Sequence, residues 1–318
     1  SVAEYGQSLA LVTYNRMLRR LASLLNEHAV TSRTMHSFVW RDYVAKTSSE
    51  PAYRAESYDY DWDAILASLD GHENAAHGLD HLVVDEGQDL PEGFFRYARR
   101  HAAVALNVFA DEDQALANRR TTLRQIKDAA GLPDPILLKD NHRNSPEIAA
   151  VAEHFHSGVL PAAMVRRRVT AQLPRLVLSA STQASCERVA TAFRNRGGTV
   201  GVVVNSNATG AAAFAALRGL LTGVRVSHYT NKSKNEDSIA LLESGITVLN
   251  KESVKGQEFD TVFLLEVEAL VPCSTDAMRR SMYMLCSRAR DTLVLVHGRG
   301  LSAAALAALP GERLLDRG

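Results

Sequence analysis

Short apolar runs alternate with segments of helical periodicity along the whole chain. The runs are rich in Val, Ile and Leu, a composition typical of strands buried in a sheet. Strands that alternate in this way with helical patterns predict a parallel sheet flanked by helices. The expected strands are residues 9–13, 81–85, 104–110, 176–179, 200–205, 246–249, 261–266 and 292–297.

Two stretches interrupt this alternation. Residues 47–60 are polar and are expected to form a surface loop, and residues 157–174 contain two prolines and little periodicity. The chain has 318 residues, which exceeds the usual size of a single hydrophobic core. We therefore expect two domains, residues 1–135 and 136–318.

Composition narrows the class of protein. Hydrophobic residues make up 46% of the chain and charged residues 23%, values that fit a globular protein and exclude a disordered one. The formal net charge is zero, so no general basic field attracts nucleic acid, although a local groove can still be basic. Three cysteines without paired spacing predict reduced thiols. With no apolar run long enough to span a membrane and no secretory signal, a cytoplasmic protein is expected.

A group of acidic residues follows one of the apolar runs. Asp85 ends the expected strand 81–85, and Glu86, Gln88 and Asp89 come after it. In an open α/β sheet, ligands bind beyond the carboxyl ends of the strands. An NTPase needs one carboxylate for Mg²⁺ and a neighbouring one to activate water, roles that Asp85 and Glu86 would fill in that order. A solvated acidic turn is the alternative.

The next strand ends in a similar way. Residues 106–110 lead into Asp111, Glu112, Asp113 and Gln114. A glutamine at this place can reach a terminal phosphate. The pattern is weak alone, because strands often end in an Asp turn, but it follows Asp85 by about one strand-helix unit.

Two arginines of the second half stand beside helix ends. Arg143 precedes Ser145 and Pro146, which are typical of a helix N-terminus. Arg288 lies near the end of an apolar helical pattern, where a buried guanidinium needs an anion. A phosphate would serve, and a structural salt bridge is the alternative for each. The triplet 166–168 is interpreted as a solvated basic face.

In chain order these segments resemble the motifs of the UvrD/Rep class of superfamily-one helicases, and the resemblance spans nearly the whole chain. Residues 11–16 look like motif Ia, and Thr-Met-His-Ser-Phe at 34–38 looks like motif Ib. Both motifs contact single-stranded DNA in that family. The resemblance therefore implies nucleic-acid contacts by Thr13, Asn15, His36, Ser37 and Phe38.

The acidic segments resemble two further motifs. Asp-Glu-Gly-Gln-Asp at 85–89 matches the Asp-Glu-x-Gln-Asp of motif II, which gives magnesium binding to Asp85 and the catalytic base to Glu86. Gln88 belongs to the same nucleotide site. Asp111 and Gln114 match motif III, in which the glutamine senses the γ-phosphate.

The second half supplies the remaining motifs. Asn-His-Arg-Asn at 141–144 matches motif IV, Lys-Gly-Gln-Glu-Phe at 255–259 is one residue from motif V, and residues 283–289 follow motif VI with Ser287 in place of Thr. The resemblance implies arginine fingers at Arg143 and Arg288, nucleotide contacts at Gly256, Glu258 and Tyr283, and a DNA contact at Lys255.

The resemblance implies two tandem RecA-like domains that bind ATP with Mg²⁺ and move on single-stranded DNA, with RNA as an alternative partner. The family's phosphate-binding loop, Gly-x-x-x-x-Gly-Lys-Ser/Thr, occurs nowhere in the 318 residues. We expect the first domain to be incomplete at its N-terminus and this chain alone to be inactive, with the loop supplied by a longer parent or another chain. A naturally loopless relative is the second choice.

Three details depart from the family. No aromatic residue follows Gln114 in 115–118, Glu252 stands at a histidine position of motif V, and the short segments between motifs leave little room for large insertions. These departures keep a second hypothesis open, a non-catalytic helicase-like scaffold or nucleic-acid sensor in a larger nuclease or defence assembly.

Overall fold

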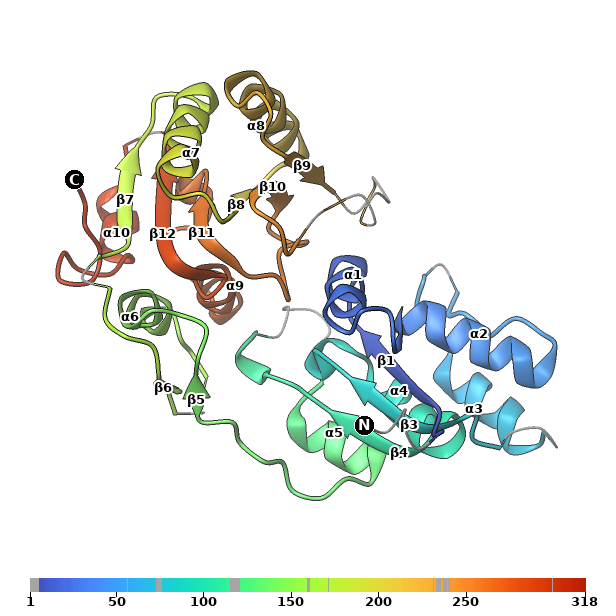
Figure 1. Ribbon diagram of the computed structural model, residues 1–318. Coiled ribbons are helices and arrows are strands. Elements are labelled where there is room, and N and C mark those ends of the chain that lie inside the picture. Colours follow the sequence, from blue (N-terminus) through green and yellow to red (C-terminus); the bar gives the residue numbers. More distant parts are fainter. Residues whose placement is uncertain are drawn as a thin grey trace. The chain divides into compact units, whose positions relative to one another are not determined.

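The computed structural model describes residues 6–55, 57–72, 76–114, 121–158, 161–170, 172–230, 232, 236, 239, 241–298 and 300–318. The chain divides into two compact units, unit 1 (1–137) and unit 2 (138–318). Each unit contains a parallel sheet with helices (Figure 1). The protein is thus a mixed α/β protein with parallel sheets, as its sequence pattern predicts.

Unit 1 has a four-stranded sheet in the order β2-β1-β3-β4, and every neighbouring pair is parallel. Its strands are β1 (Leu9–Thr13), β2 (Thr31–Thr34), β3 (Leu79–Val84) and β4 (Ala103–Val108). Its helices are α1 (Arg16–Leu25), α2 (Met35–Thr47), α3 (Trp62–Asp70), α4 (Glu92–Tyr97) and α5 (Leu123–Ala130). One-turn helices cover Gly87–Asp89, Ala98–Ala102 and Glu112–Gln114.

Local sequence explains where the helices of unit 1 begin. The Asn15 side chain accepts a hydrogen bond from the Leu18 amide at 2.7 Å and so caps α1. Thr122 and Gln125 form a reciprocal capping box at the start of α5. The core beneath these helices is one apolar cluster that includes Val12, Phe38, Ile65, Leu82, Val84, Phe94 and Leu106.

Unit 2 has a six-stranded parallel sheet in the order β7-β12-β11-β8-β10-β9. The strands are β7 (Arg175–Leu178), β8 (Thr199–Val204), β9 (Val226–Tyr229), β10 (Gly245–Asn250), β11 (Phe259–Leu264) and β12 (Ala289–His297). A separate two-stranded ribbon pairs β5 (Asp140–Asn141) with β6 (Met164–Val165).

Helices cover both faces of the sheet of unit 2. The pair α7 (Thr182–Arg196) and α8 (Asn207–Leu220) packs together, and so does the pair α6 (Pro146–His154) and α9 (Asp276–Cys286). Figure 1 shows these pairs on opposite faces, with α10 (Ala303–Ala307) near β7. A one-turn helix covers Val267–Ala269. Parallel strands buried on both faces explain the nearly continuous apolar runs of β8 and β10.

All eight expected strands are present, with ends that differ by up to three residues from the prediction. The sequence pattern missed β2, β9, β5 and β6. The first two are edge strands of four residues that lack a continuous apolar run, and the last two have only two residues each. Among the helices of the described residues, none is long and apolar enough to cross a membrane. Assignment of the units as RecA-like domains stays a prediction.

Candidate functional site

The acidic segments of unit 1 lie at the carboxyl ends of two adjacent strands. Asp85 and Glu86 follow β3, and Asp111 follows β4. Backbone hydrogen bonds join the segments that follow these two strands. The Phe109 amide donates to the Val84 carbonyl at 2.8 Å, and the Gly87 amide donates to the Phe109 carbonyl at 2.9 Å. The two segments that are predicted to contact a nucleotide therefore lie next to each other in the structure.

Gln88 links these two segments through its side chain, which is completely buried. Its Nε2 donates to Glu86 Oε2 at 2.5 Å, and its Oε1 accepts from the Asp111 amide at 2.9 Å. Gln114 continues the chain of hydrogen bonds, with Nε2 donating to Asp111 Oδ2 at 2.6 Å. Four of the predicted site residues thus form one hydrogen-bonded network within unit 1.

Backbone geometry at the end of β3 explains how this network fits. Glu86 has φ 56° and ψ 43°, in the left-handed region that is costly for a non-glycine residue. At Gly87, an added Cβ would lie 2.6 Å from Val108 Cγ1, so only glycine permits this close approach of the segment after β3 to the end of β4. Asp85 Oδ1 accepts from the Glu86 amide at 2.9 Å, which orients the Asp85 carboxylate.

The electrostatic environment of Asp111 follows from its position. Burial raises the pKa of Asp111, and the negative charges of Asp113 and Glu86 raise it further. Hydrogen bonds from Gln114 and from the Asp113 amide act in the opposite direction. The net effect is a raised pKa of Asp111.

The remaining predicted residues of unit 1 lie at the end of β1, directly after it, and in the first turn of α2. Thr13 is buried and donates through Oγ1 to the Asn15 carbonyl at 3.2 Å, while Asn15 caps α1. Phe38 packs in the core, whereas His36 and Ser37 are exposed. The exposed members of the predicted DNA-contacting set at this place are therefore His36 and Ser37.

In unit 2, Asn144 joins the predicted arginine segments. Its Nδ2 donates to the carbonyls of Ser287 at 2.9 Å and Ala289 at 2.6 Å, which flank Arg288. Asn141 Oδ1 accepts from the amides of Arg143 and Asn144 at 3.0 and 3.1 Å. Residues 141–145 are thereby fixed against residues 287–290, two segments that lie far apart in the sequence.

The two predicted arginine fingers have different surroundings. Arg143 Nε donates to Glu258 Oε2 at 2.9 Å, and both side chains are about two-fifths exposed, at 38% and 42%. Arg288 is buried, and its guanidinium donates to the carbonyls of Met284 at 2.9 Å and Gln257 at 3.4 Å. It also donates to Ser287 Oγ at 3.0 Å. The guanidinium of Arg143 is held by an exposed ion pair, whereas that of Arg288 is held by buried hydrogen bonds.

The segment between β10 and β11 carries the other predicted residues of unit 2. Lys255 is completely buried, Gly256 has φ +76°, and Glu252 and Glu258 are exposed. The positive φ explains the glycine, since other residues are strained there. Separately, the Tyr283 ring lies 5.4 Å from that of His156 and is partly exposed. These placements do not test the roles of Lys255, Gly256, Glu258 and Tyr283, which stay predictions.

Arg167 is a contributor that sequence reasoning missed. Its Nη1 donates to the carbonyls of Arg143 at 3.0 Å and Arg290 at 2.9 Å, and its Nη2 donates to Asp291 Oδ1 at 2.6 Å. Arg166 pairs with Asp140 at 2.9 Å. The triplet is therefore more than a solvated face, because two of its members hold the arginine segment in position. Nothing in the local sequence indicates these long-range partners.

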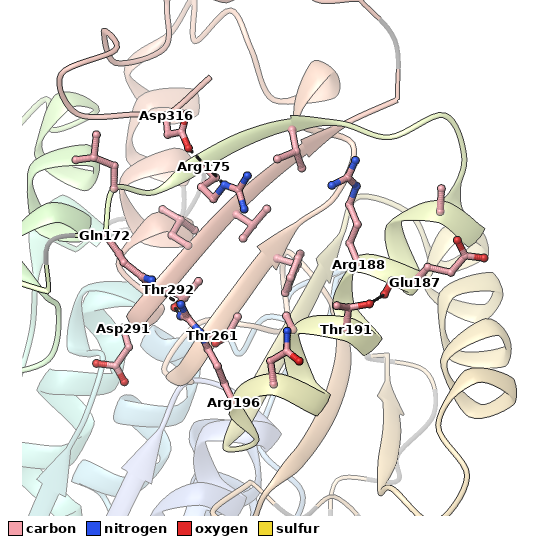
Figure 2. Close-up of a pocket in the computed structure, with 18 residues that line it drawn as sticks. Gln172, Arg175, Glu187, Arg188, Thr191, Arg196, Thr261, Asp291, Thr292 and Asp316 are labelled. Carbon is pink, nitrogen blue, oxygen red and sulfur yellow. Dashed lines mark hydrogen bonds and ion pairs between the residues drawn. The ribbon is translucent and has the colours of Figure 1, made fainter. Parts of the chain in front are cut away.

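A groove of about 910 Å³ lies elsewhere in unit 2, between α7 and strands β7, β12 and β11 (Figure 2). Arg196 closes one end, where it donates to Thr292 Oγ1 and to Gln172 Oε1, the latter at 2.5 Å. Arg188 stands on the α7 rim and Asp316 near β7 (Figure 2). None of the sequence-predicted site residues lines this groove.

Comparisons with known proteins give limited guidance. No family model matches the chain, and no curated protein matches it. Solved structures that resemble it include the C-terminal domain of a possible DNA helicase from Lactobacillus plantarum WCFS1, with 22% identity and a TM-score of 0.40. That match covers 55% of this chain and 96% of the other. A likeness of this degree assigns no function, so the functional argument depends on the motifs and their geometry.

Proposed function

We propose that this chain is the core of an ATP-dependent DNA helicase or translocase of the UvrD-like type, which couples ATP hydrolysis to movement on single-stranded DNA. The phosphate-binding loop would be supplied from outside these 318 residues, by a longer parent or by another chain. Unit 1 would carry the magnesium and catalytic carboxylates, and unit 2 would carry two arginines directed at the phosphates.

The hydrogen-bonded network of unit 1 is the observation that carries this proposal. A solvated acidic turn would leave Asp85 and Glu86 without a structural link to the next strand. Here Gln88 is buried and joins Glu86 to the Asp111 amide, and Asp111 holds Gln114. A buried glutamine that joins two partly buried carboxylate segments at strand ends fits a preorganised site better than a surface turn.

Each residue of the network has a chemical role in the proposed reaction. Asp85 would hold Mg²⁺, an ion that usually needs only one or two protein carboxylates because phosphate oxygens and water complete its shell. This fits the described residues, among which no group of three or more possible metal ligands occurs. Glu86, oriented by Gln88, would accept the proton of the attacking water. Gln114 would sense the γ-phosphate, the group that bound ATP supplies for transfer.

The arginines of unit 2 would stabilise charge that develops on the transferring phosphoryl group. Arg288 is pre-oriented by three hydrogen bonds within its own unit. Arg143 is fixed through its backbone by Asn141 and Arg167, while its guanidinium contacts Glu258. The backbone of Arg143 is thus held in place, whereas its side chain can move.

The outer edge of the unit 1 sheet offers a place for an added strand. Within the described residues β4 has one neighbouring strand, β3. Val104 of β4 is 57% exposed, and Phe109, directly after β4, is 55% exposed. An exposed apolar edge strand is a template for pairing. This arrangement supports the proposal that a strand leading to the phosphate-binding loop joins the sheet at β4.

Nucleotide binding and hydrolysis test the proposal. We would measure binding of a fluorescent ATP analogue and single-stranded-DNA-stimulated phosphate release, first with the 318-residue chain and then with a longer parent sequence that includes whatever precedes Ser1. The expected result is hydrolysis by the longer protein and its loss in Glu86→Gln. This substitution keeps the size of the side chain and an oxygen acceptor for Gln88, but it removes the base.

Glu312→Gln is the matched control, because Glu312 is exposed in unit 2 and belongs to no predicted site. It should hydrolyse ATP like the unchanged protein. If Glu86→Gln retains full activity, the assignment of the base is wrong. If neither the chain nor the longer protein binds ATP, the motor proposal is refuted and the non-catalytic scaffold is preferred.

A further inference from the structure

Two arginines of unit 1 share a cavity that no predicted site residue except Phe38 reaches. Arg33 lies on β2 and Arg41 on α2, and both line a cavity of about 300 Å³ together with Thr31 and Asp42. Arg33 is partly exposed and Arg41 is exposed. Two guanidinium groups from two elements thus face one small, open space.

Neither arginine has a compensating anion in the part of the chain that the structure describes. Among those residues, the side chains of Arg33 and Arg41 make no hydrogen bond or ion pair. The carboxylate beside them, Asp42, is engaged elsewhere, with Lys46 Nζ at 2.6 Å and with the hydroxyl of Tyr97. The acid of this cavity is therefore already neutralised by other groups.

The charge environment of Arg33 favours binding of an anion. Burial lowers the pKa of Arg33, and the positive charges of Arg41 and Arg19 lower it further. Like charges that gather without an acid are unfavourable in the free protein, and a bound anion would relieve their repulsion. The guanidinium group is the side chain best suited to a phosphate, because its planar fork binds two oxygens.

The position along α2 indicates which phosphate would bind. Ser37 and Arg41 are four residues apart on α2, so they lie on the same side of the helix, about 6 Å apart along its axis. Arg33 is the residue before Thr34, where the segment 34–38 begins. Arg41 therefore lies one helical turn beyond the exposed Ser37, which the proposed function places against single-stranded DNA. The cavity that Arg41 lines lies toward the amino-terminal ends of β1 and β2, where Leu9, Ala10 and Thr31 belong to its lining.

We propose that Arg33 and Arg41 bind a backbone phosphate of single-stranded DNA and so extend the nucleic-acid path beyond residues 34–38, along α2 and the β2 edge of unit 1. This inference rests on the proposed function, because it extends the same DNA path. The contact is to the phosphodiester and not to a base, so it positions the strand without reading its sequence. A strand too short to pass Ser37 would not reach it.

Binding of labelled oligothymidines of increasing length tests this inference. Fluorescence anisotropy would give Kd over a range of salt concentrations for the full chain, for Arg41→Gln, and for the double variant Arg33→Gln/Arg41→Gln. On long oligonucleotides we expect the double variant to bind about tenfold more weakly, as for one lost charge-assisted contact. The slope of log Kd against log salt should fall by about 0.7, the value for one phosphate of a single strand.

On the shortest oligonucleotides that still bind, the double variant and the unchanged chain should have the same Kd. Arg124→Gln is the matched control, since Arg124 is a 91% exposed arginine on α5 of the same unit and should leave every Kd unchanged. Arg41→Gln alone changes only one exposed side chain, so the inference can still be tested if the double variant does not fold. It should show part of the loss.

The outcomes separate this inference from the proposed function. If long oligonucleotides bind the unchanged chain and the double variant equally, the Arg33 and Arg41 site is refuted and the proposed function is untouched. An equal loss on short and long oligonucleotides would also overturn it, because the arginines would then not lie at the extension of the path. If no oligonucleotide binds the unchanged chain, the DNA part of the proposed function fails, and this inference fails with it.

Discussion

Replacing Gln88 with methionine should remove the side-chain link between the segments that follow β3 and β4 in unit 1. Methionine has nearly the same length and volume as glutamine but neither donates nor accepts a strong hydrogen bond, so the substitution removes the polar links without opening a cavity. The bonds that disappear are the one from Gln88 Nε2 to Glu86 Oε2 at 2.5 Å and the one from the Asp111 amide to Gln88 Oε1 at 2.9 Å.

The two losses have different sizes. Glu86 is partly exposed, so water can replace Gln88 as its partner, and this loss is about 1 kcal/mol at most. The Asp111 amide lies opposite a buried side chain, and an unsatisfied buried amide costs about 1–3 kcal/mol. We therefore expect Gln88→Met to lower the free energy of unfolding of unit 1 by about 1–4 kcal/mol, which would lower the urea midpoint by roughly 1 M.

Tryptophan fluorescence is a suitable assay, because both tryptophans of the chain, Trp40 and Trp62, belong to unit 1. Gln183→Met is the matched control. Gln183 donates to Glu187 at 3.2 Å on the exposed surface of α7 in unit 2, so its loss should leave the fluorescence transition in place. If Gln88→Met and the unchanged chain unfold at the same urea midpoint, the idea that Gln88 links the segments after β3 and β4 is refuted.

Two further predictions concern unit 1. Gly93→Ala should destabilise the unit by about 1–3 kcal/mol and alter tryptophan emission, because an added Cβ would lie 2.2 Å from Trp62 Cγ; unchanged emission and midpoint would contradict this packing. Glu86→Gln should lower the pKa of Asp111, measured by carbon NMR of its carboxyl group, because it removes one of the charges that raise that pKa; an unchanged pKa would show that the charge of Glu86 does not contribute. Since folding raises this pKa, the stability contribution of Asp111 is present below the ordinary aspartate pKa and is lost as pH rises through the raised value.

Strands buried on both faces are the ones that the sequence predicts most directly. Strand β8 reads Thr-Val-Gly-Val-Val-Val, and five of its six residues are buried. Strand β2 reads Thr-Ser-Arg-Thr and contains no buried residue, so hydrophobicity cannot reveal it. It forms because β1 offers a free edge and the register Val12 to Arg33 satisfies the backbone. Tertiary pairing, and not local preference, makes β2 a strand.

The closeness of Asp85 and Asp111 follows from a general property of parallel sheets, whereas the hydrogen bonds that join their segments do not. Carboxyl ends of adjacent parallel strands share one edge, so Asp85 and Asp111 could be expected to lie near each other. The sequence does not indicate that Gln88 turns inward and contacts both segments, because this requires the left-handed backbone of Glu86. Nor does it indicate that Asn144 holds both carbonyls that flank Arg288.

The contrast between the two arginines of unit 2 gives the proposed mechanism a physical order. An ion pair as exposed as Arg143 with Glu258 contributes about 0–1 kcal/mol, so an approaching phosphate could take Arg143 from Glu258 at little cost. Arg288 is bound to carbonyl and hydroxyl oxygens in a buried setting, and moving it would leave those bonds unmade. Arg288 is thus suited to a fixed position near the nucleotide. Arg143 is suited to engage only when the phosphate is present, which is the property that a switch between nucleotide states requires.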